Sequence, residues 1–182
     1  MENRVPQSND SAVLTSPCDG TVYSISKVKD INHLFIVKKI NYLMSDFLYG
    51  SDDFVLEMNN IVKKKHVYQM TIYLSPGDCH RYFSPGEIYV EKRVYIPGFL
   101  EPVMPSYITK HPNVFQTNER VTLQCKFAHH PNSLLYISFV GALNVGSISL
   151  NFDQLFQTNG KLVIFIFILE KKRHEQFIRK GF

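Results

Sequence analysis

Residues 73–85, "YLSPGDCHRYFSP", place titratable side chains between two Ser-Pro turn signals. Asp78 and His80 lie two residues apart, Arg81 follows, and an apolar segment comes before. A carboxylate beside an imidazole can work as an acid–base pair, because the imidazole exchanges its proton near neutral pH. This stretch is the first candidate site, and its chemistry depends on what other segments bring to it.

This stretch and the other candidate motifs in the chain also have ordinary structural interpretations. Asp78 lies in a Pro-Gly turn, where aspartate commonly bonds the local backbone. Histidines at 111, 129 and 130 could suggest a metal site, but no carboxylate or other third ligand lies at a suitable spacing. We therefore expect His111, His129 and His130 to be loop histidines and expect no metal site. The segment 144–149, "NVGSIS", lacks the lysine and the following helix of a phosphate-binding loop. No G-x-S-x-G segment is present to anchor a hydrolase triad.

The composition indicates one folded domain. The chain has 182 residues, of which 45% are hydrophobic and 20% charged. The net charge of +4 comes from short separated basic runs, which argues against a nucleic-acid partner and favours solvated faces over an anionic membrane surface. Three cysteines without a CxxC pair indicate a reducing compartment. The segment "MENRVPQSND" has neither a signal-peptide core nor a transit-peptide pattern, so no targeting signal is expected.

The pattern along the chain predicts a mainly β (α+β) fold. We expect a barrel-like or sandwich domain of short strands with one or two short helices. Apolar spacing predicts a short helix over 41–50, and the proline-rich residues 97–115 predict a long ordered loop. Glycines in the apolar segment 140–150 suggest bulges or close backbone contacts. Strands are predicted at 21–26, 33–40, 67–75, 87–96, 120–127, 134–142 and 161–170.

Five segments occur in a fixed order that carries more information than any one of them. They are "SPCDG", "YLSPGDCHRYFSP", "RVYIPGFLEPV", "NERV" and "FVGALNVGSI". This series resembles the phosphatidylserine decarboxylase family, most closely its eukaryotic mitochondrial branch. The resemblance implies a decarboxylase-like domain over 16–152. Residues 1–15 would be a disordered N-terminal segment, and 153–182 a divergent tail that lacks the family's Leu-Gly-Ser-Thr motif.

The resemblance implies a phospholipid lyase with a self-made cofactor. In the family, the serine of Leu-Gly-Ser-Thr attacks the preceding peptide carbonyl, and β-elimination then leaves a covalent pyruvoyl group. That ketone forms a Schiff base with phosphatidylserine, which becomes phosphatidylethanolamine as CO2 leaves. The implied partners are phosphatidylserine and a membrane surface. The implied location is mitochondrial, at the inner membrane.

Site residues follow from the resemblance one position at a time. Asp19 occupies the acid position of the family's Ser-Pro-x-Asp-Gly turn. His80 matches the first histidine of a His-x-x-His motif, which is associated with substrate contact and protonation. Phe83 stands where the second histidine, the base for self-cleavage, would be. No serine follows Ser149, so we expect no pyruvoyl group and no activity in this chain.

Two explanations and two other functions stay open. The chain is either an incomplete or alternatively spliced product, or a diverged relative that has lost catalysis. A non-catalytic phospholipid-binding pseudoenzyme would keep the substrate groove around His80 and lose the cofactor. An interaction partner would associate with an active paralogue, so a homo- or hetero-oligomer is also compatible with the sequence.

Overall fold

The computed structural model describes residues 14–28, 35–37, 40–49, 61, 63, 66–159 and 177–178. The described helices are α1 (Met44–Tyr49), α3 (Pro105–Ile108) and α4 (Val114–Thr117). The described strands are β1 (Thr21–Val28), β2 (Phe35–Val37), β3 (Ile40–Tyr42), β4 (Val67–Tyr73), β5 (Ile88–Ile96), β6 (Arg120–Phe127), β7 (Leu134–Val140), β8 (Ser149–Leu150), β9 (Asp153–Gln157) and β10 (Phe177–Ile178). The mainly β fold with short helices that the sequence predicts is confirmed.

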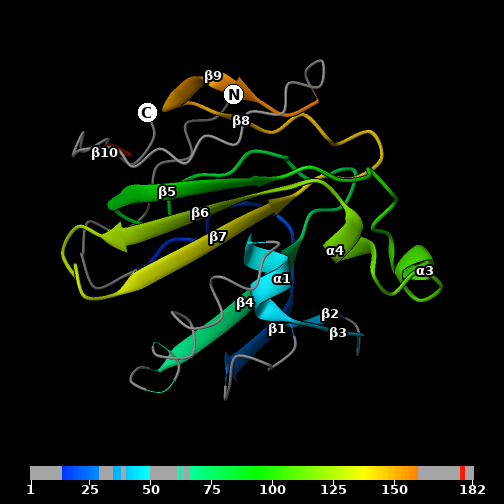
Figure 1. The fold of residues 1–182 in the computed structure, drawn as a ribbon, viewed down its shortest axis with the longest axis horizontal. Helices are drawn as coiled ribbons and strands as arrows, with labels where there is room; N and C mark the ends of the chain where they lie inside the picture. The colour runs from blue at the N-terminus through cyan, green and yellow to red at the C-terminus, as the bar shows by residue number, and fades with distance from the viewer. Residues whose placement is uncertain are drawn as a thin grey trace.

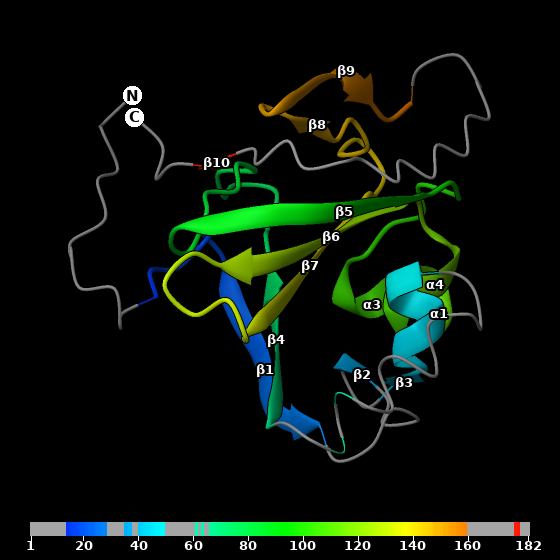
Figure 2. The same ribbon diagram turned by 60° about the vertical axis from the view of Figure 1, so that its left-hand side comes forward.

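An antiparallel sheet in the order β10–β5–β6–β7 forms the centre of the fold (Figure 1). β5 runs against β6 from Ile88 opposite Phe127 to Ile96 opposite Arg120. The other described strands form three two-stranded sheets, β1–β4, β2–β3 and β8–β9. β8 and β9 cover one face of the central sheet, and α1 lies on the other (Figures 1 and 2). In this arrangement, the loops that follow β5 and β7 lie at the end of the central sheet where β6 begins.

One face of β6 builds an apolar core. Val121, Leu123 and Cys125 alternate along the strand and are at most 2% exposed, because every second side chain points to the same face. They cluster with Ile88 of β5 and Leu150 of β8. The predicted domain boundary at 152/153 falls in the turn between β8 and β9, within this layer.

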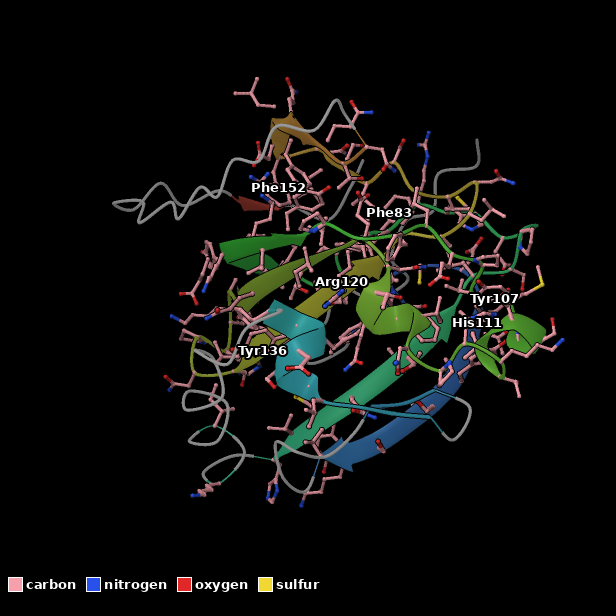
Figure 3. The ribbon with its side chains drawn as sticks, turned by 45° about the vertical axis from the view of Figure 1, so that its right-hand side comes forward. Phe83, Tyr107, His111, Arg120, Tyr136 and Phe152 are labelled. Carbon is pink, nitrogen blue, oxygen red and sulfur yellow. The ribbon has the colours of Figure 1, made fainter. Side chains whose placement is uncertain are left out.

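The opposite face of β6 binds α1 through polar groups. Arg120 is 2% exposed, and its Nε and Nη2 donate to the carbonyls of Phe47 and Asp46, both at 2.7 Å. Its Nη1 donates to Gln116 and Asn118 carbonyls at 2.7 and 3.0 Å. One guanidinium thereby satisfies carbonyls at the C-terminal ends of α1 and α4, which have no partners within their own helices. Figure 3 shows Arg120 where these helices meet the sheet.

Most predicted strands are confirmed, and one region is corrected. The strands expected near 21, 67, 87, 120 and 134 are β1, β4, β5, β6 and β7. Residues 33–40 were expected to be one strand, but β2 and β3 form a hairpin that extends to Tyr42. The helix expected from 41 therefore starts at Met44. Its apolar spacing begins at Leu43, so residues 41–42 were free to pair as a strand. The segment 161–170 lies outside the described residues.

Two regions contain local structure that the sequence did not predict. The predicted loop 97–115 contains α3 and the start of α4, and Pro105 occupies the first helical position, where no amide donor is needed. Residues 140–150 are not a continuous strand. Ala142 and Val145 form an isolated bridge around Asn144, whose φ is 65°. Close backbone contact is found at Gly141, where a Cβ would lie 3.3 Å from the Glu119 carbonyl oxygen and 3.6 Å from the Gly146 Cα.

Candidate functional site

The turn that carries Asp19 lies directly beside the segment that carries Phe83. The Phe83 amide donates a hydrogen bond to the Pro17 carbonyl at 2.6 Å. The Thr15 amide and hydroxyl both donate to the Pro85 carbonyl, at 2.9 and 3.2 Å. These bonds join the first two of the five ordered segments and fix residue 83 next to the turn.

Gly20 lets this turn approach β4 closely. Its φ is +110°, and a Cβ at this position would lie 2.3 Å from the Tyr73 carbonyl oxygen. The next residue, Thr21, pairs with Tyr73 at the start of the β1–β4 ladder. Glycine is needed here because other residues rarely adopt this φ and because no side chain fits.

Gly20→Ala is expected to lower the free energy of unfolding by about 2–4 kcal/mol, since it combines backbone strain with a steric clash. Urea unfolding followed by circular dichroism measures this. Gly77→Ala is the matched control, because a Cβ at Gly77 has no heavy atom within 4 Å. A Gly20→Ala midpoint equal to that of Gly77→Ala would contradict the role of this turn.

Asp78 and His80 serve the loop geometry in different ways. Asp78 Oδ2 accepts a hydrogen bond from the Ser75 amide at 2.6 Å, and the Asp78 amide donates to the Ser75 carbonyl at 2.9 Å. This confirms a local turn role for Asp78. His80 is exposed, and its Nδ1 lies 2.9 Å from the Asp78 carbonyl oxygen. Because a carbonyl oxygen only accepts, this contact is a hydrogen bond when Nδ1 carries the proton.

Tyr82 ties the loop to β7. Its ring packs edge-on against Phe139 with centroids 4.8 Å apart. Burial, with smaller contributions from Cys125 and Cys18, raises the pKa of the Tyr82 phenol well above its usual value. Burial also raises the pKa of the Cys18 thiol, and the charge of Asp19 adds to that effect. Both groups are therefore protonated near neutral pH, so neither supplies a base beside residue 83.

The three remaining ordered segments meet at Asn118, which is fully buried. Its Oδ1 accepts from the Glu101 amide at 3.0 Å. Its Nδ2 donates to the carbonyls of Glu101 and Gly141, both at 2.9 Å. The Glu119 amide donates to Phe99, and the Gly141 amide donates to Glu119, both at 2.8 Å. One amide side chain thus holds the loops after β5 and β7 against the start of β6.

Thr158 closes the glycine loop from the other side. It is 1% exposed, its Oγ1 donates to the Gly146 carbonyl at 2.7 Å, and the same oxygen accepts from the Ile148 amide at 2.8 Å. A Cβ on Gly146 would lie 2.5 Å from atoms of both Leu100 and Asn159. The residues just after β9 are therefore bound into the same loop cluster.

Asn118→Asp is expected to lower the free energy of unfolding by about 2–4 kcal/mol. A carboxylate oxygen would replace the donor that faces the Glu101 and Gly141 carbonyls, and a buried charge would be left unpaired. Differential scanning calorimetry measures the loss. Asn151→Asp, at an exposed position, is the matched control and should change stability little. Equal melting temperatures for the two variants would overturn this assignment.

Neither a metal centre nor a spanning helix is found in the described ranges. Among these residues, no group of three or more His, Cys, Asp or Glu side chains could hold a metal ion. No helix in the same ranges is both long and apolar enough to cross a membrane.

Sequence reasoning located the loop residues but missed those that hold the loops together. The structure brings the Asp19 turn to Phe83 and orients His80 through the backbone of Asp78. The catalytic roles carried over from the resemblance stay predictions. The organising roles of Asn118 and Thr158 were not foreseen. For Asn118, the available signal was the polar triplet Asn118-Glu119-Arg120 at the start of strand β6.

Comparison with known proteins agrees with this arrangement of segments. The sequence profile of the phosphatidylserine decarboxylase family matches residues 1–181. The mitochondrial phosphatidylserine decarboxylase proenzyme of Caenorhabditis elegans is 35% identical over 146 residues, which is 80% of this chain and 36% of that protein. The proenzyme of Campylobacter jejuni is 32% identical over 150 residues, or 81% of this chain and 53% of that protein.

A yeast relative matches a shorter part of the chain. The mitochondrial phosphatidylserine decarboxylase proenzyme 1 of Saccharomyces cerevisiae is 44% identical over 90 residues, which is 50% of this chain and 17% of that protein. The chain spans between about a third and about half the length of the worm and Campylobacter relatives. Both mitochondrial and bacterial proteins are among its relatives. The chain belongs to the phosphatidylserine decarboxylase family.

Proposed function

We propose that this chain is a phosphatidylserine decarboxylase-type domain, centred on 16–152, that cannot generate the family's pyruvoyl group. The observation that carries the proposal is the position of Phe83. Its amide is bonded to the Pro17 carbonyl at 2.6 Å, beside the turn that carries Asp19. By resemblance, this is the position of the histidine that would take the serine proton. The family is pyruvoyl-dependent and acts on phospholipid.

The side chains around residue 83 do not replace the missing base. A phenyl ring has no lone pair that can accept a proton. The raised pKa values of Tyr82 and Cys18 keep both groups protonated near neutral pH. His80 lies three positions before residue 83, and its Nδ1 contacts the Asp78 carbonyl oxygen. These groups do not suit self-cleavage by a histidine-dependent route.

The residues of this chain also do not fit the pyruvoyl group itself. That group derives from a serine in a Leu-Gly-Ser-Thr motif, and residues 150–182 contain no serine. The absence of serine from 150–182 and the replacement at Phe83 therefore act in the same direction. We assign no decarboxylation step to this chain.

The test is a lipid conversion assay. Purified chain is incubated with phosphatidylserine in detergent micelles, and the lipids are quantified by mass spectrometry. We expect no phosphatidylethanolamine above the protein-free blank, whereas the Campylobacter jejuni relative, assayed in parallel, should convert the lipid. Phosphatidylethanolamine that rises in proportion to the amount of this chain would refute the proposal.

A second candidate function is phospholipid recognition without catalysis. It is favoured by His80, which is exposed and held in one orientation by Asp78. In flotation assays, a lipid-binding pseudoenzyme would prefer vesicles containing phosphatidylserine over equally charged phosphatidylglycerol vesicles. His80→Ala should remove that preference. Equal binding to the two anionic lipids would reject this candidate.

A mitochondrial location and an active paralogue as partner complete the proposal. Mitochondrial relatives support the location, although bacterial relatives also exist. Subcellular fractionation of tagged protein tests it, and recovery outside mitochondria would count against it. Co-purification of a full-length decarboxylase with the tagged chain tests the partner.

A further inference from the structure

The two-stranded sheet β1–β4 exposes a row of apolar side chains on its outer face. Ile25 and Met70 lie directly opposite each other in the ladder and are 67% and 48% exposed. Tyr68, two residues from Met70 on the same face, is 67% exposed, and Val22 is 50% exposed. We call Val22, Ile25, Tyr68 and Met70 the outer face. β1 and β4 lie side by side on the side of the central sheet away from β8–β9 (Figures 1 and 2).

The inner face of the same strands is polar except at the Val28–Val67 pair. Ser24 lies opposite Thr71, and Ser26 lies opposite Gln69. Gln69 is 8% exposed, and neither its amide nitrogen nor its amide oxygen has a hydrogen-bond partner among the described residues. The buried hydroxyls of Ser24 and Thr71 also lack one there. This reverses the usual arrangement of a sheet, which turns apolar side chains inward and polar side chains outward.

The register of the ladder maintains this reversal. A slip of one residue would exchange the two faces, because side chains alternate along each strand. A bulge between Val22 and Ser24 fixes the pairing at one end. At the other end, Val28 pairs with Val67, and both pack into the core around α1. Because buried polar groups without partners oppose folding, the structure maintains the apolar outer face at a cost.

The one charged side chain within β1 and β4, that of Lys27, is basic. Residues 21–28 and 66–73 contain no Asp or Glu. Lys27 is exposed opposite Tyr68, and Lys63 and His66 are exposed just before β4. Tyrosine and aliphatic side chains with lysine at their edge suit the interface of a bilayer with anionic headgroups. A second copy of the same face would bring like charges together, which disfavours self-association.

We propose that the outer face of β1–β4 docks on an anionic phospholipid bilayer. β1 follows the Asp19 turn, and β4 leads into the loop that carries His80 and Phe83. Docking would therefore place the candidate site close to the lipid surface. The inference goes beyond the proposed function, because it requires neither a pyruvoyl group nor recognition of the serine headgroup.

A single-tryptophan experiment tests the docking surface. The chain contains no tryptophan, so Tyr68→Trp introduces one reporter. Leu155→Trp is the matched control, because Leu155 is fully exposed on β9, away from this face. With vesicles of phosphatidylcholine and phosphatidylglycerol, we expect a blue shift and quenching by brominated lipid for Tyr68→Trp only. Equal shifts for both variants, or none for Tyr68→Trp, would overturn the proposal.

Loss-of-binding variants provide the second measurement. Ile25→Ser combined with Met70→Ser should weaken partitioning onto anionic vesicles at least tenfold, because buried apolar area drives interfacial binding. Leu155→Ser should bind like the unaltered chain, and circular dichroism should show all three proteins folded. Lys27→Glu should weaken binding at low salt. Normal vesicle binding by the double variant would contradict the proposal. The proposal would also be contradicted if the unaltered chain forms a dimer that does not bind vesicles and if the double substitution dissociates that dimer.

These outcomes are separable from those of the proposed function. Equal docking on phosphatidylserine and phosphatidylglycerol vesicles supports the outer face and rejects recognition of the serine headgroup. Formation of phosphatidylethanolamine would reject the loss of catalysis and leave the docking measurements unaffected.

Discussion

Phe83→His is expected to restore self-cleavage when the chain also receives a family C-terminal segment with Leu-Gly-Ser-Thr in place of residues 160–182. The Phe83 amide bond to Pro17 does not involve the side chain, so a histidine can take the same backbone position beside Asp19. A positioned general base contributes about 10²–10⁴-fold in rate. A time course on denaturing gels measures the appearance of two fragments.

The same chimera provides its own controls. With Phe83 unchanged, or with Phe83→Leu, it should remain one polypeptide over the same period. Adding Asp19→Asn to the Phe83→His chimera should slow cleavage, if Asp19 orients the imidazole as the resemblance implies. Cleavage with Phe83 in place, or none with Phe83→His in a folded chimera, would show that the missing base is assigned to the wrong residue.

Arg120→Leu is expected to lower the free energy of unfolding by about 3–5 kcal/mol. Four main-chain carbonyls, of Asp46, Phe47, Gln116 and Asn118, would lose their charged donor. Burial lowers the pKa of Arg120 to about 10, so the guanidinium is still charged at neutral pH and all its donors are present. Chemical unfolding in guanidinium chloride measures the loss.

Two variants separate geometry from charge at this position. Arg120→Lys keeps the charge but cannot reach carbonyls on both helices, so we expect an intermediate loss of stability. Arg81→Leu, at an exposed position, should change stability by less than about 0.5 kcal/mol. An unfolding midpoint of Arg120→Leu that matches Arg81→Leu would contradict the bridging role.

The central strands could be predicted because their side chains alternate over a long run. In β6, Val121, Leu123 and Cys125 alternate with polar residues and pack on one face. The β2–β3 hairpin could not be separated from the helix that follows, because each element has only a few residues. Short elements of this kind are decided by tertiary contacts, which sequence periodicity does not contain.

The candidate site was only partly accessible from the sequence. The ordered segments pointed to Asp19 and His80, which match the family motif, and to Phe83, which departs from it. Asn118 bonds main-chain groups of distant loops. Every residue has a main-chain carbonyl, so the sequence does not reveal which carbonyls Asn118 bonds. The outer face was hidden for a related reason. Alternation predicts β1, but it does not say which of its two faces is turned toward the core.

The most direct measurement is the intact mass of the purified chain, residues 1–182. If this chain cannot process itself, electrospray mass spectrometry will show one species near 21.1 kDa, unchanged by sodium borohydride. Cleavage at any internal serine would instead give two fragments, one with a borohydride-reducible pyruvoyl terminus. That result would contradict the loss of self-cleavage.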